Sequence, residues 1–410
     1  MKPKLSAWLQ DKLDRYKRKK ELPFPRLPDP RPHALTPSPS QEILPQECLF
    51  FKKLPYELRR QILIQAFGKD RLHMDLSFEH PPAPYAPGQP RERDHAGVHA
   101  TNGGCGKYPR LDHTQPKSWI WWSSICHRYF HPPDRDGRPG PMSGGWGPQG
   151  PWEDYCRYGY AAYCDEWPGH VPFKCRVGVM GWLLSCRQAY EEGVDVLYKT
   201  NCVCMSSEVM ITHLPELLLP QRLAAMTSLE ISWPLKCCQK GDQIPTLKEG
   251  HLETLFTLIP LHFDNLSCLY IALQPTDGMA LVNKWLNVES VLTQFDGLVQ
   301  QMPGLVECCI ALPESVFTDL LYPMLAALRV KYPAPARLRW LNQIWRFLDG
   351  KHVVAEPQNN TYPNPPHRSR EVDGAKSSMG YWIVQGGVDE GDMSGRMAMQ
   401  GCFGSSGMIQ

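Results

Sequence analysis

A regular alternation of helical and extended segments between residues 208 and 312 constrains this chain more than any other feature. Three segments with helical periodicity each precede a shorter segment in which apolar and polar residues alternate; the helical segments are 208–226, 247–259 and 284–300. The centres of the extended segments, Ile231, Ile271 and Ile310, lie 40 and 39 residues apart. Strands that alternate with helices at such a spacing are typical of crossover units. We therefore predict an α/β (or α+β) fold with a parallel or mixed sheet.

The same regularity also fits an α/β solenoid, in which each unit buries its apolar face against the next unit. The repeat is longer than the roughly 20 to 29 residues of leucine-rich repeats, so the spacing does not identify that class. Within the second unit, Thr246-x-x-Glu249 matches a capping box and predicts that a helix begins at 247.

The segments that flank this region also carry clear periodic patterns. Residues 181–198 are predicted to form a single helix with one apolar face, which comprises Trp182, Cys186, Ala189, Gly193 and Leu197. Residues 202–206 follow as a predicted strand. A last helix is expected over 314–330, and residues 380–386 are a candidate edge strand.

Nearer the N-terminus, residues 54–67 predict another helix, with Pro55 at its first position and Gly68 as its stop. Leu58 and Ile62 form an apolar stripe at a spacing of four residues, and Leu63 widens it. The face around them is expected either to dock a partner or to join the core. Next, residues 72–78 alternate between apolar and polar side chains, which predicts a half-buried strand.

Residues 79–180 differ in composition from the rest of the chain. They hold 15 Pro, 14 Gly and 15 aromatic residues. Proline and glycine at this density indicate irregular structure, whereas disordered segments are usually poor in aromatic residues. We expect a long insertion that packs by its aromatic side chains around a loose tip near 132–151. A G-x-G-x-x-G match at 145–150 lies in this Pro/Gly loop rather than between a strand and a helix, so it does not indicate a phosphate site.

Four cysteines of the insertion are candidate zinc ligands, because thiolates suit tetrahedral zinc and a metal can organise a long loop. They are Cys126, Cys156, Cys164 and Cys175. Their spacing lacks the short paired knuckles of common zinc modules, and free thiols are the other interpretation. No cofactor is predicted, and the chain contains no H-E-x-x-H, P-loop, G-x-S-x-G or C-x-x-C pattern.

Charge and hydropathy limit the partners and the compartment. Lys+Arg 44 nearly balance Asp+Glu 42, so no nucleic-acid partner is expected. No apolar run reaches the length that spans a bilayer, and the charged N-terminal residues do not resemble a signal peptide. We expect a cytoplasmic or nuclear protein with mostly free thiols. Residues 1–44, a basic amphipathic helix and a Pro-rich linker, and the tail 351–410 are expected to be largely disordered around one domain at 45–350.

The segment LPxELxxxI at 54–62 resembles the first helix of an F-box. An F-box presents apolar helices to an Skp1-type adaptor of a ubiquitin ligase, by helix-in-groove recognition. The resemblance implies that the partner-binding residues are Leu54, Pro55, Leu58, Ile62 and Leu63. An F-box continues with two further helices, whereas this chain is predicted to enter a strand at Leu72.

Over a longer stretch, the chain resembles a family of uncharacterised filamentous-fungal proteins with an F-box-like start. The resemblance rests on residues 54–62, 183–201 and 214–233. It implies no established activity. Our leading hypothesis is a non-enzymatic interaction or scaffold protein, more in keeping with the sequence than an enzyme. The alternatives are an enzyme whose site lies in loops at the strand ends and a zinc-organised binding module.

Overall fold

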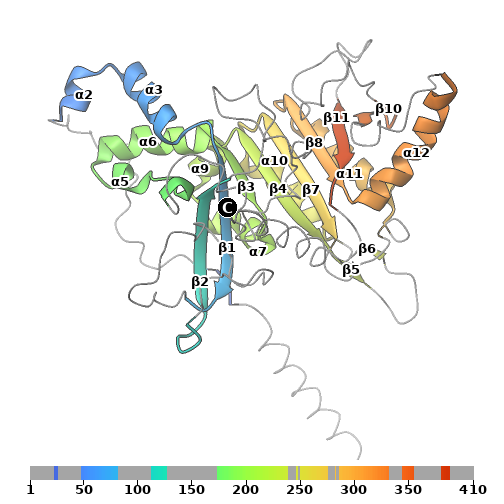
Figure 1. Cartoon of the computed structure of the whole chain (residues 1–410), viewed down its shortest axis with the longest axis horizontal. Coiled ribbons are helices and arrows are strands. Elements are labelled where there is room, and N and C mark those ends of the chain that lie inside the picture. The colour runs from blue at the N-terminus through green and yellow to red at the C-terminus, as the bar shows by residue number, and fades with distance from the viewer. Residues whose placement is uncertain are drawn as a thin grey trace, which may run out of the picture.

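The computed structural model of the 410-residue chain describes residues 23–25, 48–81, 112–126, 173–238, 246–247, 250–275, 282, 286–331, 344–354 and 380–387. Figure 1 shows these residues in colour. The basic amphipathic helix predicted within residues 1–44, the loop tip at 132–151 and the G-x-G-x-x-G segment lie outside them. So do most of the Pro-rich linker and most of the tail after 354.

Nine strands of the described residues form one mixed sheet in the order β10-β9-β11-β8-β7-β4-β3-β1-β2. Their bounds are β1 Arg71–Glu79, β2 Ser118–Ile125, β3 Cys202–Met205, β4 Ser228–Leu235, β7 Cys268–Pro275, β8 Glu307–Leu312, β9 Ile344–Phe347, β10 His352–Val354 and β11 Gly380–Gln385. Strands β1, β3, β4, β7, β8 and β11 are parallel, and β2, β9 and β10 pair antiparallel at the two ends. The predicted α/β fold with a mixed sheet is confirmed.

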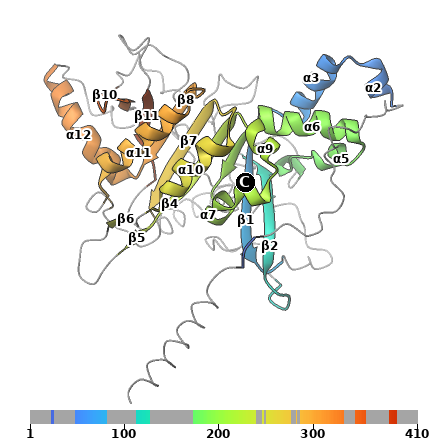
Figure 2. The same ribbon diagram turned by 180° about the vertical axis from the view of Figure 1, so that it is seen from behind.

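Helices alternate with these strands along the chain. Their bounds are α2 Leu49–Lys53, α3 Tyr56–Phe67, α5 Met180–Leu183, α6 Arg187–Thr200, α7 Glu208–Thr212, α8 Leu214–Leu217, α9 Pro220–Ala225, α10 Glu253–His262, α11 Val288–Gln301 and α12 Glu314–Lys331, with a 3₁₀ turn η3 at Phe173–Cys175. Helices α7 to α12 pack their apolar residues into one core with a single face of the sheet. Figure 2 shows α10 and α11 on this side of the strands.

The three predicted strand centres form one continuous row across the sheet. Ile231 pairs with Ile271, and Ile271 pairs with Ile310. The row continues to Ile383 of β11 and Ile344 of β9. All five side chains are at most 1% exposed. The predicted shared interior of alternating helices and strands is therefore confirmed.

The order of the parallel strands shows how the units are wound. From β1 through β3, β4, β7 and β8 each new strand is added on the same side of the previous one. Right-handed crossovers in a constant direction place their helices on one face of the sheet, as observed. The order of these strands lacks the reversal that creates the ligand crevice of a doubly wound sheet.

One predicted helix is interrupted, and the predicted start of another is wrong. The predicted helix over 181–198 is broken into α5 and α6, because Cys186 is extended and its Sγ accepts a hydrogen bond from the amide of Ala189 at 3.3 Å, which caps α6. Helix α10 begins at Glu253 rather than at 247. Thr246 and Leu247 form β6, which pairs with β5 at Cys237–Cys238, so the capping-box match has no helix to cap.

The ends of the sheet also differ from expectation. The candidate edge strand at 380–386 is β11, which lies between β8 and β9 rather than at an edge. It is enclosed because β9 and β10, which the sequence patterns do not predict, extend the sheet beyond it. At the opposite end, the insertion contributes β2, which pairs with the whole length of β1.

Strand β1 is buried on both faces instead of one. Its apolar side, with Leu72 and Leu76, faces inward as predicted. On the other side His73, Asp75 and Glu79 are only 5%, 2% and 2% exposed. Alternation of polar and apolar residues therefore gave the correct strand but the wrong environment for its polar face. The sheet carries buried polar groups on the side that faces away from its helices.

Candidate interaction site

Helix α3 lies at one end of the molecule, beside α2, α5 and α6 (Figure 1). Its inner face consists of Leu63, Ile64 and Phe67, which are buried against Val194 and Val196 of α6 in a second small core. Gly68 ends the helix where a Cβ atom would lie 2.6 Å from Oγ1 of Thr200, so only glycine permits this close approach. The predicted helix and its stop are confirmed, but Pro55 is the N-cap and not the first helical residue, so α3 begins at Tyr56.

A buried ion pair holds the start of α3 on α6. Arg59 donates from Nε to Oε2 of Glu192 at 2.9 Å and from Nη2 to Oε1 at 2.6 Å. Its Nη1 donates to the carbonyl oxygen of Leu54 at 2.6 Å, which fixes the turn that leads into the helix. The hydrogen bonds to Glu192 raise the pKa of Arg59, so the guanidinium stays charged.

Asn201 holds the end of α3. Its Nδ2 donates to the carbonyl oxygens of Phe67 and Leu197, each at 2.9 Å, and its Oδ1 accepts from the amide of Asp70 at 2.8 Å. These carbonyls belong to the last turns of α3 and α6, where helices have no internal partner for them. One side chain, 1% exposed, therefore caps two helices and connects them to the residue before β1.

The structure separates the five predicted partner-binding residues. Leu63 is 3% exposed and belongs to the core. Leu58 and Ile62 are 47% and 46% exposed on the opposite side of α3. Pro55 is exposed and Leu54 is half-buried at the entry to the helix. We define the docking face as Leu58, Ile62 and Ala66 with Gln61 and Gln65, all of which are exposed.

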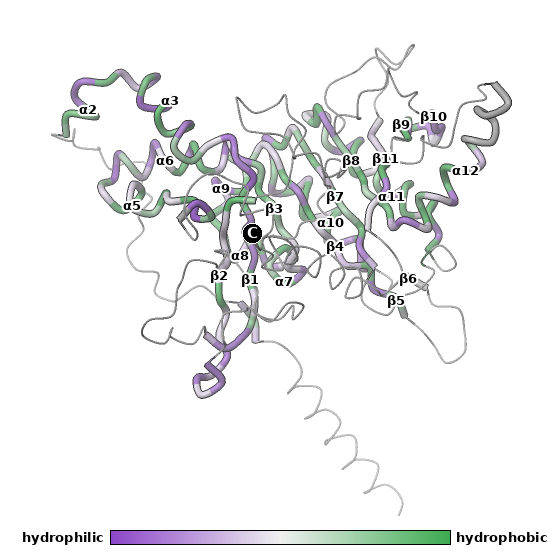
Figure 3. Tube along the Cα trace, viewed as in Figure 1, coloured by the Kyte–Doolittle hydropathy of each residue, from purple (hydrophilic) through white to green (hydrophobic). Residues whose placement is uncertain are grey.

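Apolar residues remain on α3 although the helix lies at the periphery of the molecule (Figure 3). Other large apolar side chains of this helical end are also exposed, namely Leu49, Tyr56, Met180 and Leu184. The chain leaves α3 for strand β1, as predicted, and does not continue with the two further helices of an F-box. Instead, α6, from more than 100 residues later in the chain, packs on α3, with α5 packed on α6 in turn.

The thiols that we considered as zinc ligands are only partly described. Cys126 and Cys175 are 1% and 0% exposed, on segments where η3 packs against β2. Cys156 and Cys164 lie outside the described residues. The four-cysteine zinc arrangement thus stays a prediction.

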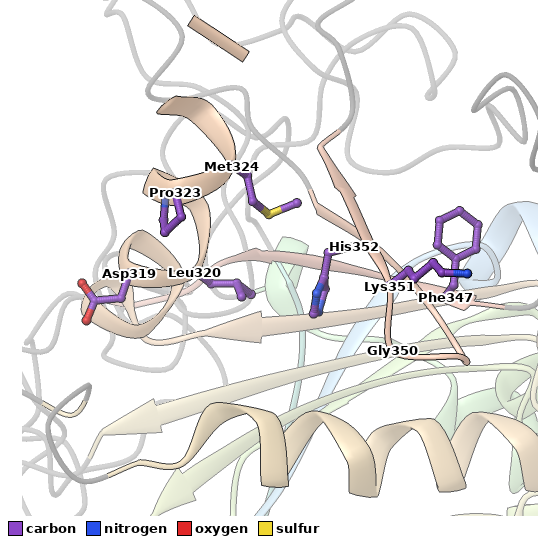
Figure 4. Close-up of a pocket in the computed structure, with 8 residues that line it drawn as sticks. All are labelled: Asp319, Leu320, Pro323, Met324, Phe347, Gly350, Lys351 and His352. Carbon is purple, nitrogen blue, oxygen red and sulfur yellow. The ribbon is translucent and has the colours of Figure 1, made fainter. Parts of the chain in front are cut away.

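A second feature, at the other end of the sheet, is an open hollow of about 580 Å³ between α12 and the turn from β9 to β10. Figure 4 shows His352 and Lys351 on one side and Asp319, Leu320 and Met324 on the other. Lys351 is paired with Asp349 at 2.8 Å. Among the residues that line the hollow, we find no nucleophile held by a base, the arrangement that covalent catalysis requires.

His352 lines this hollow and also belongs to a buried polar network centred on Arg346. The side chain of Arg346 is 1% exposed and binds Asp296 through Nη2 at 2.7 Å and Glu289 at 2.7 Å. Its Nη1 lies 2.8 Å from Nε2 of His352. Although burial lowers the pKa of Arg346, its hydrogen bonds to Asp296 and Glu289 outweigh burial and raise it.

Tyr381 completes this network, with its hydroxyl 3.0 Å from both Oδ1 of Asp296 and the carbonyl oxygen of Leu292. Burial, followed by the charge of Asp296, raises the pKa of Tyr381. The network joins β9 and β11 to α11. Its groups satisfy one another, so its evident role is to lock the last strands onto the scaffold.

A domain of unknown function (DUF7730) matches residues 149–313. The match covers α5 to α11 and strands β3, β4, β7 and β8. It also contains the segments 183–201 and 214–233. No curated protein and no solved structure matches the chain.

The match is smaller than the folded unit. Helix α3 and strands β1 and β2 precede it, and β9, β10 and β11 follow it, yet these strands extend the same sheet. Among the described helices, none combines the length and apolar character needed to cross a membrane.

Proposed function

We propose that this protein is a non-catalytic interaction scaffold of the filamentous-fungal F-box-like kind, which acts in the cytoplasm or nucleus. The single observation that carries the proposal is the exposure of Leu58 and Ile62 on the docking face of α3, opposite a face that is fully packed. A helix that is apolar on two sides can be anchored by one of them and offer the other to a partner.

The partner that fits this face best is an Skp1-type adaptor, which would receive α3 in an apolar groove. Anchors one turn apart, such as Leu58 and Ile62, are typical of helix-in-groove recognition. Arg59 and Asn201 fix both ends of α3, so little conformational entropy is lost on binding. The sheet and its covering helices then serve as the rigid body that carries surface loops to other partners.

A direct binding measurement tests the proposal. The full chain and an Skp1-type adaptor are titrated by calorimetry, and Leu58→Asp and Ile62→Asp are compared with wild type. Each residue is already half-covered, so the apolar surface still to be buried is worth about 1 kcal/mol. The unpaired charge of Asp adds to that loss. We expect each variant to bind at least about tenfold more weakly.

Leu261→Asp is the matched control, because Leu261 is 66% exposed on α10, away from the docking face. It should leave the affinity unchanged. Unaltered far-ultraviolet circular dichroism of all three variants would show that the fold is retained. The proposal fails if wild type does not bind the adaptor, or if Leu58→Asp and Leu261→Asp bind alike.

A further inference from the structure

The most suggestive chemistry lies on the sheet face that points away from the helices. Cys202 and Cys204 are two residues apart on β3, so their side chains point to the same face. Glu230 of β4 is the direct neighbour of Cys204 in the sheet. One ligand atom from each of these three residues lies within 4.8 Å of the others. Cys204 and Glu230 are each 6% exposed, and Cys202 is half-buried.

We propose that Cys202, Cys204 and Glu230 form a binding site for a borderline-soft divalent cation, of which zinc is the biological candidate. Thiolate and carboxylate ligands are those that zinc takes in proteins, at about 2.3 Å for sulfur and about 2.0 to 2.2 Å for oxygen. Around a tetrahedral ion such ligands are separated by about 3.5 to 3.8 Å. The observed cluster needs only a contraction of about 1 Å to reach that geometry.

The hydrogen bonds of the cluster resemble the outer sphere of a metal site. Arg71 donates from Nε to Oε1 of Glu230 at 2.6 Å, which leaves Oε2 on the side of the thiols. The Sγ of Cys204 donates to Oε2 at 3.3 Å. A metal ion would replace that thiol proton between sulfur and Oε2, while Arg71 would keep its hydrogen bond to Oε1. Outer groups that orient ligands in this way are a regular part of metal sites.

Charge balance supports the assignment. Two thiolates and one carboxylate carry three negative charges, and Arg71 with a divalent ion supplies three positive charges. A buried site of zero net charge avoids the cost of an uncompensated charge in the interior. His73 lies beside Cys204 in the register of β1 and β3, on the same face, and is 5% exposed. The ring nitrogens of His73 lie outside the group of ligand atoms within 4.8 Å of one another, so the imidazole would have to move to take the fourth position, which water could otherwise fill.

Cobalt binding to the full chain tests this site, because Co²⁺ replaces zinc and reports thiolate ligands by a charge-transfer band. Under reducing conditions, wild type should bind one equivalent at this site with that band. Cys202→Ser and Cys204→Ser should each weaken the band or abolish it. Arg71→Met, which removes only the outer group, should weaken binding about 10- to 100-fold. Glu230→Gln keeps an acceptor for Arg71 and should weaken binding while the fold is retained.

Two control variants separate this site from other thiols. Cys268→Ser changes a thiol of the same sheet face on β7, outside the cluster, and should leave the band intact. Cys126→Ser removes a thiol of the zinc arrangement predicted in the insertion and should also have no effect on this band. The proposal is overturned if wild type gives no thiolate band, or if the band keeps its full intensity in both Cys202→Ser and Cys204→Ser. Loss of the band only in Cys126→Ser would likewise overturn it.

Discussion

Replacing Asn201 by Ala should destabilise the protein out of proportion to the size of the change. The substitution removes three hydrogen bonds, of which the one to the carbonyl oxygen of Phe67 is wholly buried. A buried acceptor left without a partner costs about 1 to 3 kcal/mol, and each of the two partly buried bonds contributes about 0.5 to 1.5 kcal/mol. We expect the free energy of unfolding to fall by about 3 kcal/mol.

Urea unfolding followed by tryptophan fluorescence measures this change. For a folded unit of this size, about 3 kcal/mol corresponds to a decrease in Tm of roughly 6 to 12 °C. Hydrogen exchange should show faster exchange for the last turn of α3, because its cap is lost. Asn201→Asp keeps the acceptor for the amide of Asp70 but cannot donate, so it should be at least as damaging as Asn201→Ala.

Asn265→Ala provides the matched control. Asn265 also donates from Nδ2 to a backbone carbonyl, that of Ala224 at 2.7 Å, but in an exposed position. Its loss should cost at most about 1 kcal/mol. If Asn201→Ala and Asn265→Ala destabilise the protein equally, the hydrogen bonds of Asn201 do not hold α3 and α6 to the residue before β1.

Two further predictions concern titration. The guanidinium of Arg346 can only donate hydrogen bonds, so Nε2 of His352 accepts and the imidazole is neutral. Burial, followed by the charge of Arg346, lowers the pKa of His352. Its contribution to stability is therefore complete above its ordinary pKa of 6.5 and is lost as the pH falls below that value. Unfolding measured across pH should show less acid sensitivity for His352→Gln, and an unchanged profile would contradict this role. Burial also raises the pKa of Cys308 to about 12. At pH 8, a thiol reagent should therefore label exposed Cys48 and should not label Cys308 until the protein unfolds. Rapid labelling of Cys308 in the folded protein would refute its burial.

The sequence alone predicted the elements whose patterns are local. The alternation around Ile231, Ile271 and Ile310 gave the strands, because a residue's face on a strand depends only on its neighbours in the chain. The same holds for α3, whose stop follows from Gly68 and whose start lies one residue after Pro55. The boundary at Cys186 and the β6 segment were missed because each depends on one specific contact, a thiol cap and a two-residue pairing.

Tertiary structure decided what lies on each face. Periodicity marked Leu58, Ile62 and Leu63 as one apolar stripe, but only the position of α6 determines that Leu63 is buried while the other two stay exposed. The Cys-x-Cys spacing on a predicted strand could have indicated two thiols on one side. It could not show that β4 brings Glu230 beside them or that Arg71 comes from a strand 131 residues earlier than Cys202. Periodicity is a property of consecutive residues, whereas burial and the pairing of distant charges depend on which strands become neighbours, and that choice is made by the sheet as a whole.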